Sequence, residues 1–149
     1  SIAAALAHHP KLLILDEATS GLDPIVRDEI LDVFYEFIQD EEHSILFSSH
    51  ITSDLEKIAD YVTFIHEGRI VFSRNKDVLI DEYGIARCTA TQFETVQSGD
   101  YLRRRTTGLG GRELLVKDRA AFHALYPDIV LDGASIEDIM LFYVKGELA

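Results

Sequence analysis

The chain has a single cysteine, Cys88, among its 149 residues. One thiol excludes an internal disulfide and is typical of a reducing compartment such as the cytosol. No apolar run approaches the roughly 20 residues of a membrane span, and no basic-then-apolar signal sequence opens the chain. Cys88 has no second thiol or nearby His with which to form a metal cluster. The spacing of the residues suggests no Ser-His-Asp arrangement for nucleophilic catalysis.

Basic residues are scarce and unevenly distributed. The 14 Lys and Arg are outnumbered by 26 Asp and Glu, and the net charge of −12 argues against nucleic acid or anionic lipid as a partner. Up to Gly84 there are 6 basic and 17 acidic residues, whereas from Ile85 onward there are 8 and 9. This change in composition predicts a boundary near Gly84, between a first part at 1–84 and a tail at 85–149.

Residues 12–24, LLILDEATSGLDP, are the most informative stretch of the chain. The four apolar residues 12–15 predict a strand that is buried on both faces, as in a parallel sheet. Asp16 and Glu17 follow at its carboxyl end, where open α/β sheets bind their ligands. After a polar turn, Asp23 can cap the helix that the following proline opens.

This string resembles the Walker B strand and D-loop of the ABC-type ATPases. The resemblance implies that Asp16 binds the Mg²⁺ of a bound ATP and that Glu17 is the general base that polarises the attacking water. It also implies that the turn after them crosses a dimer interface towards the partner's active site, through Ser20, Gly21, Leu22 and Asp23. Mg²⁺ independently suits this pattern, because it takes one or two protein carboxylates beside phosphate oxygens. Neighbouring strand residues point to opposite faces, so we expect the two acids to have different roles.

His50 is the second candidate catalytic residue. It follows a second predicted buried strand at 44–49, beyond a helix predicted from Pro24 to about Asp40. A lone His at a strand end is more often structural, but Phe-Ser-Ser-His resembles the switch histidine of the same family. The resemblance implies that His50 hydrogen-bonds a γ-phosphate oxygen and keeps Glu17 aligned. Thr52 or Ser53 is predicted to cap the next helix.

The rest of the first part is predicted to be a hairpin, with strands at 61–65 and 70–73, and a helix at 76–83 that ends at Gly84. In the ABC family, the strand that ends at the phosphate loop lies between the strands corresponding to 44–49 and 61–65. Those two strands would then face a gap in this chain, and unpaired strands invite association with another chain. We therefore expect self-association rather than internal closure of the sheet.

The tail is predicted to have a β-α-β-β-α-β order, which is a ferredoxin-like arrangement. The expected elements are a strand at 85–90, a helix at 92–97, a hairpin of 101–107 and 112–117, a helix at 119–125, a strand at 129–131 and a final helix at 135–145. Within the hairpin, Arg104 should point away from Arg103 and Arg105. This alternation favours a solvated face, with a phosphate or regulatory ligand site as the alternative.

The ABC resemblance covers Ser1 to about Gly84 and implies an α/β fold, a partial P-loop NTPase parallel sheet with helices, followed by the small α+β tail. Neither the family's signature loop nor a Gly-x-x-x-x-Gly-Lys-Ser/Thr phosphate loop occurs in the sequence. We interpret the chain as the carboxyl-terminal part of a longer protein. The full-length protein is expected to be an ATPase, and the 149-residue chain alone is expected to be inactive.

The leading hypothesis is part of the ATP-hydrolysing subunit of an ABC transporter, an exporter, that couples hydrolysis to a membrane partner. Small α+β tails of this kind occur on ATPase subunits of exporters whose membrane part is a separate chain. The resemblance implies ATP and Mg²⁺ as cofactors, a second ATPase subunit in a homodimer, and a permease chain that holds the protein at the cytoplasmic face of the membrane. No nucleic acid partner is expected. Two alternatives stay open: an ABC-type ATPase of DNA repair or chromosome structure, and a non-catalytic regulatory module that keeps the fold.

Overall fold

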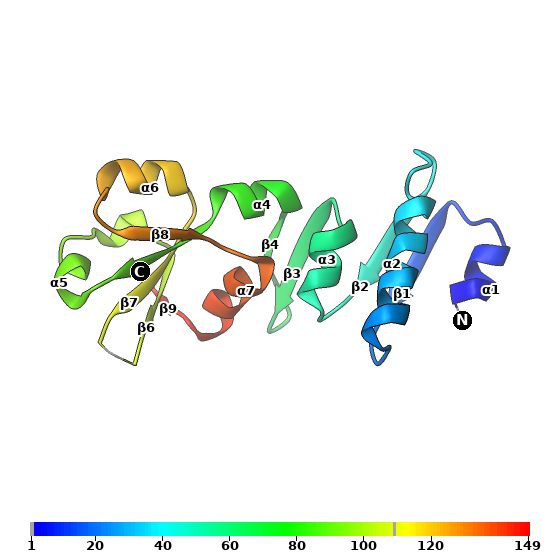
Figure 1. Cartoon of the computed structure of the whole chain (residues 1–149), viewed down its shortest axis with the longest axis horizontal. Helices are drawn as coiled ribbons and strands as arrows, with labels where there is room; N and C mark the ends of the chain where they lie inside the picture. Colours follow the sequence, from blue (N-terminus) through cyan, green and yellow to red (C-terminus); the bar gives the residue numbers. More distant parts are fainter. Residues whose placement is uncertain (1, 109) are drawn as a thin grey trace. The chain divides into compact units, whose positions relative to one another are not determined.

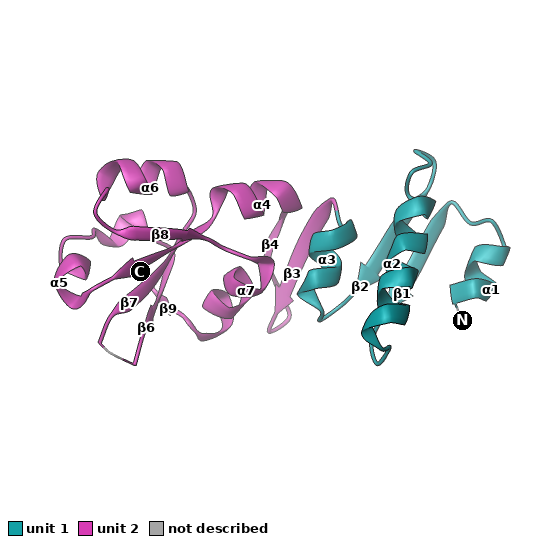
Figure 2. Cartoon of the chain, viewed as in Figure 1, with its two compact units in different colours: residues 1–59 teal, residues 60–149 magenta. Residues whose placement is uncertain are grey.

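The computed structural model describes residues 2–108 and 110–149 (Figure 1). It contains two compact units, Ser1–Ala59 and Asp60–Ala149, which Figure 2 colours separately. This division differs from the boundary predicted at Gly84, because residues 60–84 pack with the tail. The Phe72 ring, for example, lies 6.0 Å from the ring of Tyr143. The Gly84 boundary, which rests on the change in charge and on the extent of the family resemblance, stays a prediction.

The first unit is built around a parallel pair of strands. Its elements are α1 (Ile2–Ala7), β1 (Leu12–Asp16), α2 (Pro24–Phe37), β2 (Ser44–Ser48) and α3 (Thr52–Ile58). Strands β1 and β2 pair in parallel, with Leu12 opposite Ser44 and Asp16 opposite Ser48. Helix α2 connects them, as a parallel crossover requires. The predicted order of strand, helix, strand and helix is therefore confirmed.

One face of this sheet forms the core of the first unit. Leu15, Ile45 and Phe47 point to that face and pack against Leu31 and Phe34 of α2 and Ile58 of α3. Alternation along the strands turns the other apolar side chains outward.

The prediction that β1 and β2 are buried on both faces was wrong. On the outer face Leu12, Ile14 and Leu46 are 53%, 70% and 64% exposed. Helices of this unit cover a single face of the sheet, so an unbroken apolar run does not by itself guarantee burial on both sides.

The helix starts of the first unit were predicted with mixed success. Asp23 caps α2 as expected, since its Oδ1 accepts hydrogen bonds from the amides of Ile25 at 3.0 Å and Val26 at 3.1 Å. The cap predicted for α3 was wrong, because Thr52 is already the first residue of the helix and the capping position belongs to Ile51. Ser49 Oγ accepts from the Ile51 amide at 3.0 Å just before the helix.

The second unit begins with a β-hairpin, as predicted. Strands β3 (Tyr61–His66) and β4 (Arg69–Asn75) are antiparallel. Glu67 and Gly68 between them have φ angles of 49° and 73°, which is the backbone of a tight hairpin turn with both central residues left-handed. Helix α4 (Lys76–Glu82) follows, with Asn75 as its cap.

The tail has the predicted ferredoxin-like topology. Its elements are β5 (Gly84–Cys88), α5 (Ala90–Phe93), a 3₁₀ turn η1 (Ser98–Asp100), β6 (Arg103–Thr106), β7 (Arg112–Val116), α6 (Arg119–Leu125), β8 (Val130–Gly133), α7 (Ile136–Lys145) and β9 (Glu147–Leu148). The strand order is β8-β5-β7-β6-β9, and every neighbouring pair is antiparallel. The first four strands thus have the order of a split βαβ sheet. Helix α5 is shorter than expected and begins earlier.

Buried apolar residues on one face of the tail sheet pack together with Phe122 of α6. Cys88 belongs to this cluster, and its burial raises the pKa of the thiol. Across residues 2–108 and 110–149, no helix has the length and apolar character needed to cross a membrane.

The three consecutive arginines join the sheet to its neighbours rather than forming a solvated face. Arg103 and Arg105 stack over Tyr143 and Phe142 of α7, at 5.1 Å and 4.0 Å from the ring centroids. Arg104 points to the opposite side, as predicted, and pairs with Glu147 at 3.0 Å. These contacts attach α7 and β9 to the sheet. They give no support to the alternative that the three arginines form a ligand site.

Gly84 has a different role from the predicted helix cap. The C-cap of α4 is Tyr83, with extended backbone, and Gly84 is the first residue of β5. A Cβ at Gly84 would lie 2.5 Å from Cγ of Arg119. The Arg119 guanidinium donates to the Asp81 carbonyl, with its Nη2 at 2.7 Å. The glycine is therefore required by the close approach of this arginine.

We expect the isolated chain to self-associate through the outer face of the β1–β2 sheet, since Leu12, Ile14 and Leu46 expose apolar surface there. The acidic surface opposes association at low salt, so the dimer should strengthen as salt screens the charges. Sedimentation velocity at two salt concentrations measures this. Leu46→Thr should weaken association, whereas Val33→Thr, at an exposed position of α2, should not. A monomer at both salt concentrations would contradict the prediction.

Candidate active site

The parallel pairing of β1 and β2 brings the predicted catalytic residues to one edge of the sheet. The carboxyl ends of parallel strands meet at the same edge, and Asp16 pairs with Ser48 at the end of the register. Glu17 follows directly after β1, and His50 comes two residues after β2. The acid pair and the histidine thus become neighbours in space, although Glu17 and His50 lie 33 positions apart in the sequence.

Ser48 holds the acid pair from the neighbouring strand. Its hydroxyl donates to Oδ1 of Asp16 and accepts from the Glu17 amide at 3.1 Å. The same amide also lies 3.1 Å from the Ser48 carbonyl oxygen. Sequence reasoning did not identify Ser48, although a hydroxyl opposite a strand-end carboxylate in a parallel register is the signal that could have found it.

Glu17 leaves the strand in an unusual backbone conformation. Its φ is +47°, a left-handed value that is uncommon for residues other than glycine and is found where the surroundings enforce it, often at functional sites. The turn sends the carboxylate towards His50, whose Nδ1 lies 2.7 Å from Oε2 of Glu17. The two acids therefore have different partners, as expected, although the cause is the break after β1 rather than alternation within a strand.

The Glu17–His50 pair lies open to solvent. The side chains of His50 and Glu17 are 69% and 39% exposed. Asp16 is exposed as well. All three groups are accessible to a ligand at this edge of the sheet.

The turn from Ser20 to Asp23 is a surface segment with a fixed backbone. The Ser20 amide donates to the Glu17 carbonyl at 3.0 Å, and Leu22 donates to Thr19 at 3.4 Å. Gly21 has a φ of +74° with open space around it, so the backbone conformation and not crowding requires glycine there. Ser20, Gly21 and Asp23 are exposed and available to a partner.

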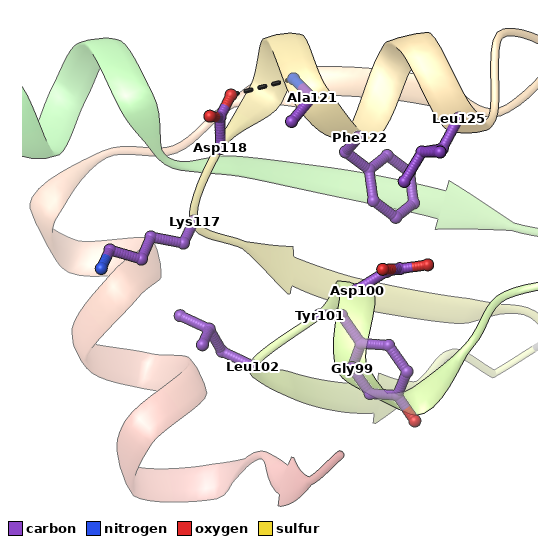
Figure 3. A pocket seen from close by; sticks show the side chains of 9 residues that line it. All are labelled: Gly99, Asp100, Tyr101, Leu102, Lys117, Asp118, Ala121, Phe122 and Leu125. Atoms are coloured by element: carbon purple, nitrogen blue, oxygen red, sulfur yellow. Dashed lines mark hydrogen bonds between the residues drawn. The ribbon is translucent and has the colours of Figure 1, made fainter.

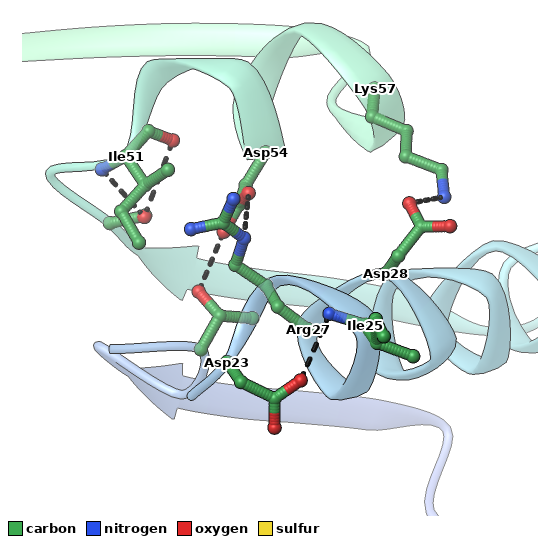
Figure 4. Close-up of polar contacts among 9 residues, drawn as sticks. Asp23, Ile25, Arg27, Asp28, Ile51, Asp54 and Lys57 are labelled. Atoms are coloured by element: carbon green, nitrogen blue, oxygen red, sulfur yellow. Dashed lines mark hydrogen bonds and ion pairs between the residues drawn. The ribbon is translucent and has the colours of Figure 1, made fainter. Parts of the chain in front are cut away.

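A buried polar group lies beneath this turn, and sequence reasoning missed it. Asp54 of α3 is 1% exposed and Thr19 is 2% exposed. The Thr19 hydroxyl donates to Oδ2 of Asp54 at 2.6 Å, and Arg27 Nε lies 3.6 Å from Oδ1 (Figure 4). The sequence signal that could have found Asp54 is its position four residues before the buried Ile58, because this spacing puts both residues on the same face of α3.

Asp16 could contribute a carboxylate to a Mg²⁺ ion that phosphates and water also coordinate. Among residues 2–108 and 110–149, no group of three or more His, Cys, Asp and Glu is arranged to hold a metal ion. Asp16 offers an exposed carboxylate, and Mg²⁺ needs one or two such groups when phosphates and water supply the rest. Asp16 is the residue that would hold the ion.

Two pockets formed by described residues lie in the tail. One of about 280 Å³ lies between η1 and α6 and is lined by residues that include Tyr101, Lys117 and Phe122 (Figure 3). Nearby, the Tyr126 hydroxyl donates to Asp100, and this bond raises the pKa of the tyrosine. None of the predicted site residues lines this pocket.

Curated proteins with similar sequences are transporter ATP-binding proteins, whereas a scan against models of protein families gives no match. The lantibiotic transport ATP-binding protein SrtF of Streptococcus pyogenes is 46% identical over 76 residues, which are 51% of this chain and 33% of that protein. The bacitracin transport ATP-binding protein BcrA of Bacillus licheniformis is 46% identical over 70 residues, 47% of this chain and 23% of that protein. The energy-coupling factor transporter ATP-binding protein EcfA2 of Clostridium acetobutylicum is 38% identical over 82 residues, 55% of this chain and 29% of that protein.

These similarities confirm the predicted resemblance to ATP-binding subunits of ABC transporters. They cover about half of the chain, which agrees with the extent expected from the motifs. The chain spans about a quarter to a third of the length of these curated relatives.

We expect the 149-residue chain alone to bind MgATP weakly, with a Kd at or above about 1 mM, or roughly −4 kcal/mol. The sequence has no phosphate loop, and the acid pair meets the nucleotide as like charge. Isothermal titration calorimetry measures the affinity, and a titration with MgCl₂ alone separates binding of the metal ion. Micromolar binding of MgATP would contradict this expectation.

Proposed function

We propose that this chain is part of the ATP-hydrolysing subunit of an ABC transporter that exports its substrate. The observation that carries the proposal is the meeting of Asp16, Glu17 and His50 at the carboxyl edge of the β1–β2 sheet. The Glu17–His50 distance of 2.7 Å places a base and a hydrogen-bonding group side by side. Similarity to transporter ATP-binding proteins supports the same activity.

Each of the three side chains has its own role in the proposed reaction. Asp16, oriented by Ser48, would hold the Mg²⁺ that accompanies ATP, and the ion would supply neutralisation of charge on the phosphates. Glu17 accepts a proton from the water that attacks the γ-phosphorus. His50 keeps the Glu17 carboxylate in place by donating from Nδ1, and in its imidazolium form it also donates from Nε2 to a γ-phosphate oxygen. Catalysis of this kind depends on positioning and electrostatics, which the two paired strands supply.

The exposed turn supports an interface with a second ATPase subunit. Ser20, Gly21, Leu22 and Asp23 lie next to Glu17, and three of the four are exposed. In the proposed homodimer this turn faces the partner's active site. A permease chain holds the dimer at the cytoplasmic face of the membrane.

A role in transport draws support from the relatives, and export as its direction draws support from the tail. SrtF and BcrA are named for transport of a lantibiotic and of bacitracin. The ferredoxin-like tail suits ATPase subunits whose membrane part is a separate chain. The acidic first part, with 17 acidic and 6 basic residues, disfavours a DNA-bound ATPase.

Glu17→Gln in the full-length protein should retain ATP binding and lose most ATP hydrolysis. Glutamine has nearly the same shape as glutamate but cannot accept the proton, and loss of general base catalysis costs about 10²- to 10⁴-fold in rate. Steady-state phosphate release and nucleotide binding measure the two effects separately. Glu41→Gln, in the exposed loop after α2, is the matched control and should hydrolyse ATP normally. Turnover by Glu17→Gln near the wild-type rate would exclude Glu17 as the base.

A further inference from the structure

Asp54 is a buried carboxylate that the proposed reaction does not use. It is 1% exposed, and it lies on α3, four positions after His50. Its carboxylate oxygens face two groups from outside α3: Oδ2 accepts from the Thr19 hydroxyl at 2.6 Å, and Oδ1 lies 3.6 Å from Arg27 Nε (Figure 4). A buried charge is costly unless it is paired and hydrogen-bonded, so an acid is an expensive choice for a position that only fills space.

The two partners of Asp54 lie at the two ends of the exposed turn. Thr19 directly precedes Ser20, and Arg27 lies in α2, where its amide donates to the carbonyl of the Asp23 cap at 3.0 Å. One carboxylate therefore ties both ends of the turn to the helix that begins two residues after His50. Glu17 is fixed at the same place, because its carbonyl accepts from the Ser20 amide at 3.0 Å.

A second connection between the same two helices provides a comparison. Lys57 of α3 contacts Asp28 and Asp32 of α2 at 2.7 Å each, and these hydrogen bonds raise the pKa of the lysine. The carboxylates of this pair are 67% and 63% exposed. An exposed ion pair holds its partners only loosely. The buried hydrogen bond between Asp54 and Thr19 is therefore the contact that can fix the position of the turn relative to α3.

We propose that Asp54 is a positioning residue that fixes the Ser20–Asp23 turn and the Glu17–His50 pair relative to each other. Contact of a partner with the turn is thereby transmitted to the base and the histidine. Asp54 itself touches neither nucleotide nor water in this role. The inference rests on the proposed function, because Glu17 and His50 must be the reacting groups for their placement to affect turnover.

Thr19→Val tests this in the full-length protein, because it removes the hydroxyl with little change of shape. The kcat for ATP hydrolysis should fall about 10- to 100-fold, the scale on which small misplacements act, while KM for ATP stays unchanged. Thr19→Ser keeps the hydroxyl, so its kcat should stay at the wild-type value. Asp28→Asn removes a surface contact between the same helices and should leave kcat at the wild-type value.

A readout on the 149-residue chain separates failure of this inference from failure of the proposed function. The NMR signals of the His50 ring and the Glu17 amide should shift in Thr19→Val and not in Thr19→Ser or Asp28→Asn. If Thr19→Val does not fold, Arg27→Gln, which removes the half-buried partner, should give the same shifts and the same loss of kcat.

Three outcomes would overturn the inference. The first is that the NMR signals and kcat are unchanged in Thr19→Val and Arg27→Gln. The second is that kcat falls equally in Thr19→Val and Thr19→Ser. The third is that a rise in KM for ATP accounts for the whole loss of activity. The proposed function fails separately, if the wild-type full-length protein does not hydrolyse ATP while the shifts occur as expected.

Discussion

The parallel pairing of β1 with β2 is the constraint on which the candidate site depends. Its register places Asp16 opposite Ser48, and the contacts of the acid pair with Ser48 and His50 follow from that placement. The Ser48 hydroxyl reaches Asp16 and the Glu17 amide together, and the chain then turns so that Glu17 meets His50. A slip by one residue would turn each side chain to the other face of the sheet and disperse this group.

The sequence predicted those parts of the structure that short-range chemistry determines. The strand 12–15, the Asp23 cap and the hairpin turn at Glu67-Gly68 depend on residues within a few positions of one another. The tail topology was also predictable, because turns and apolar runs alternate along it. Asp16, Glu17 and His50 were predicted by resemblance to a family, and the structure brings them to one edge.

The sequence could not predict features that depend on residues distant along the chain. Burial of β1 was predicted on both faces, but the apolar run does not reveal how many helices cover the sheet, and Ile14 is 70% exposed. Gly84 was predicted to be a helix cap, but the close approach of Arg119, 35 positions later in the sequence, is what requires glycine there. In the sequence, Asp54 could not be distinguished from an acidic residue on the exposed face of an amphipathic helix. Its contact with Thr19 joins residues 35 positions apart, and no local pattern reports such a pair.

The register of β1 and β2 can be measured directly by NMR on the isotopically labelled chain. The account predicts cross-strand nuclear Overhauser effects between Ile14 and Leu46 and between Asp16 and Ser48, together with protection of the Glu17 amide from hydrogen exchange. It further predicts contacts from the Glu17 side chain to the His50 ring. A parallel register displaced by one residue, an antiparallel pairing, or a Glu17 side chain remote from His50 would contradict the central claim.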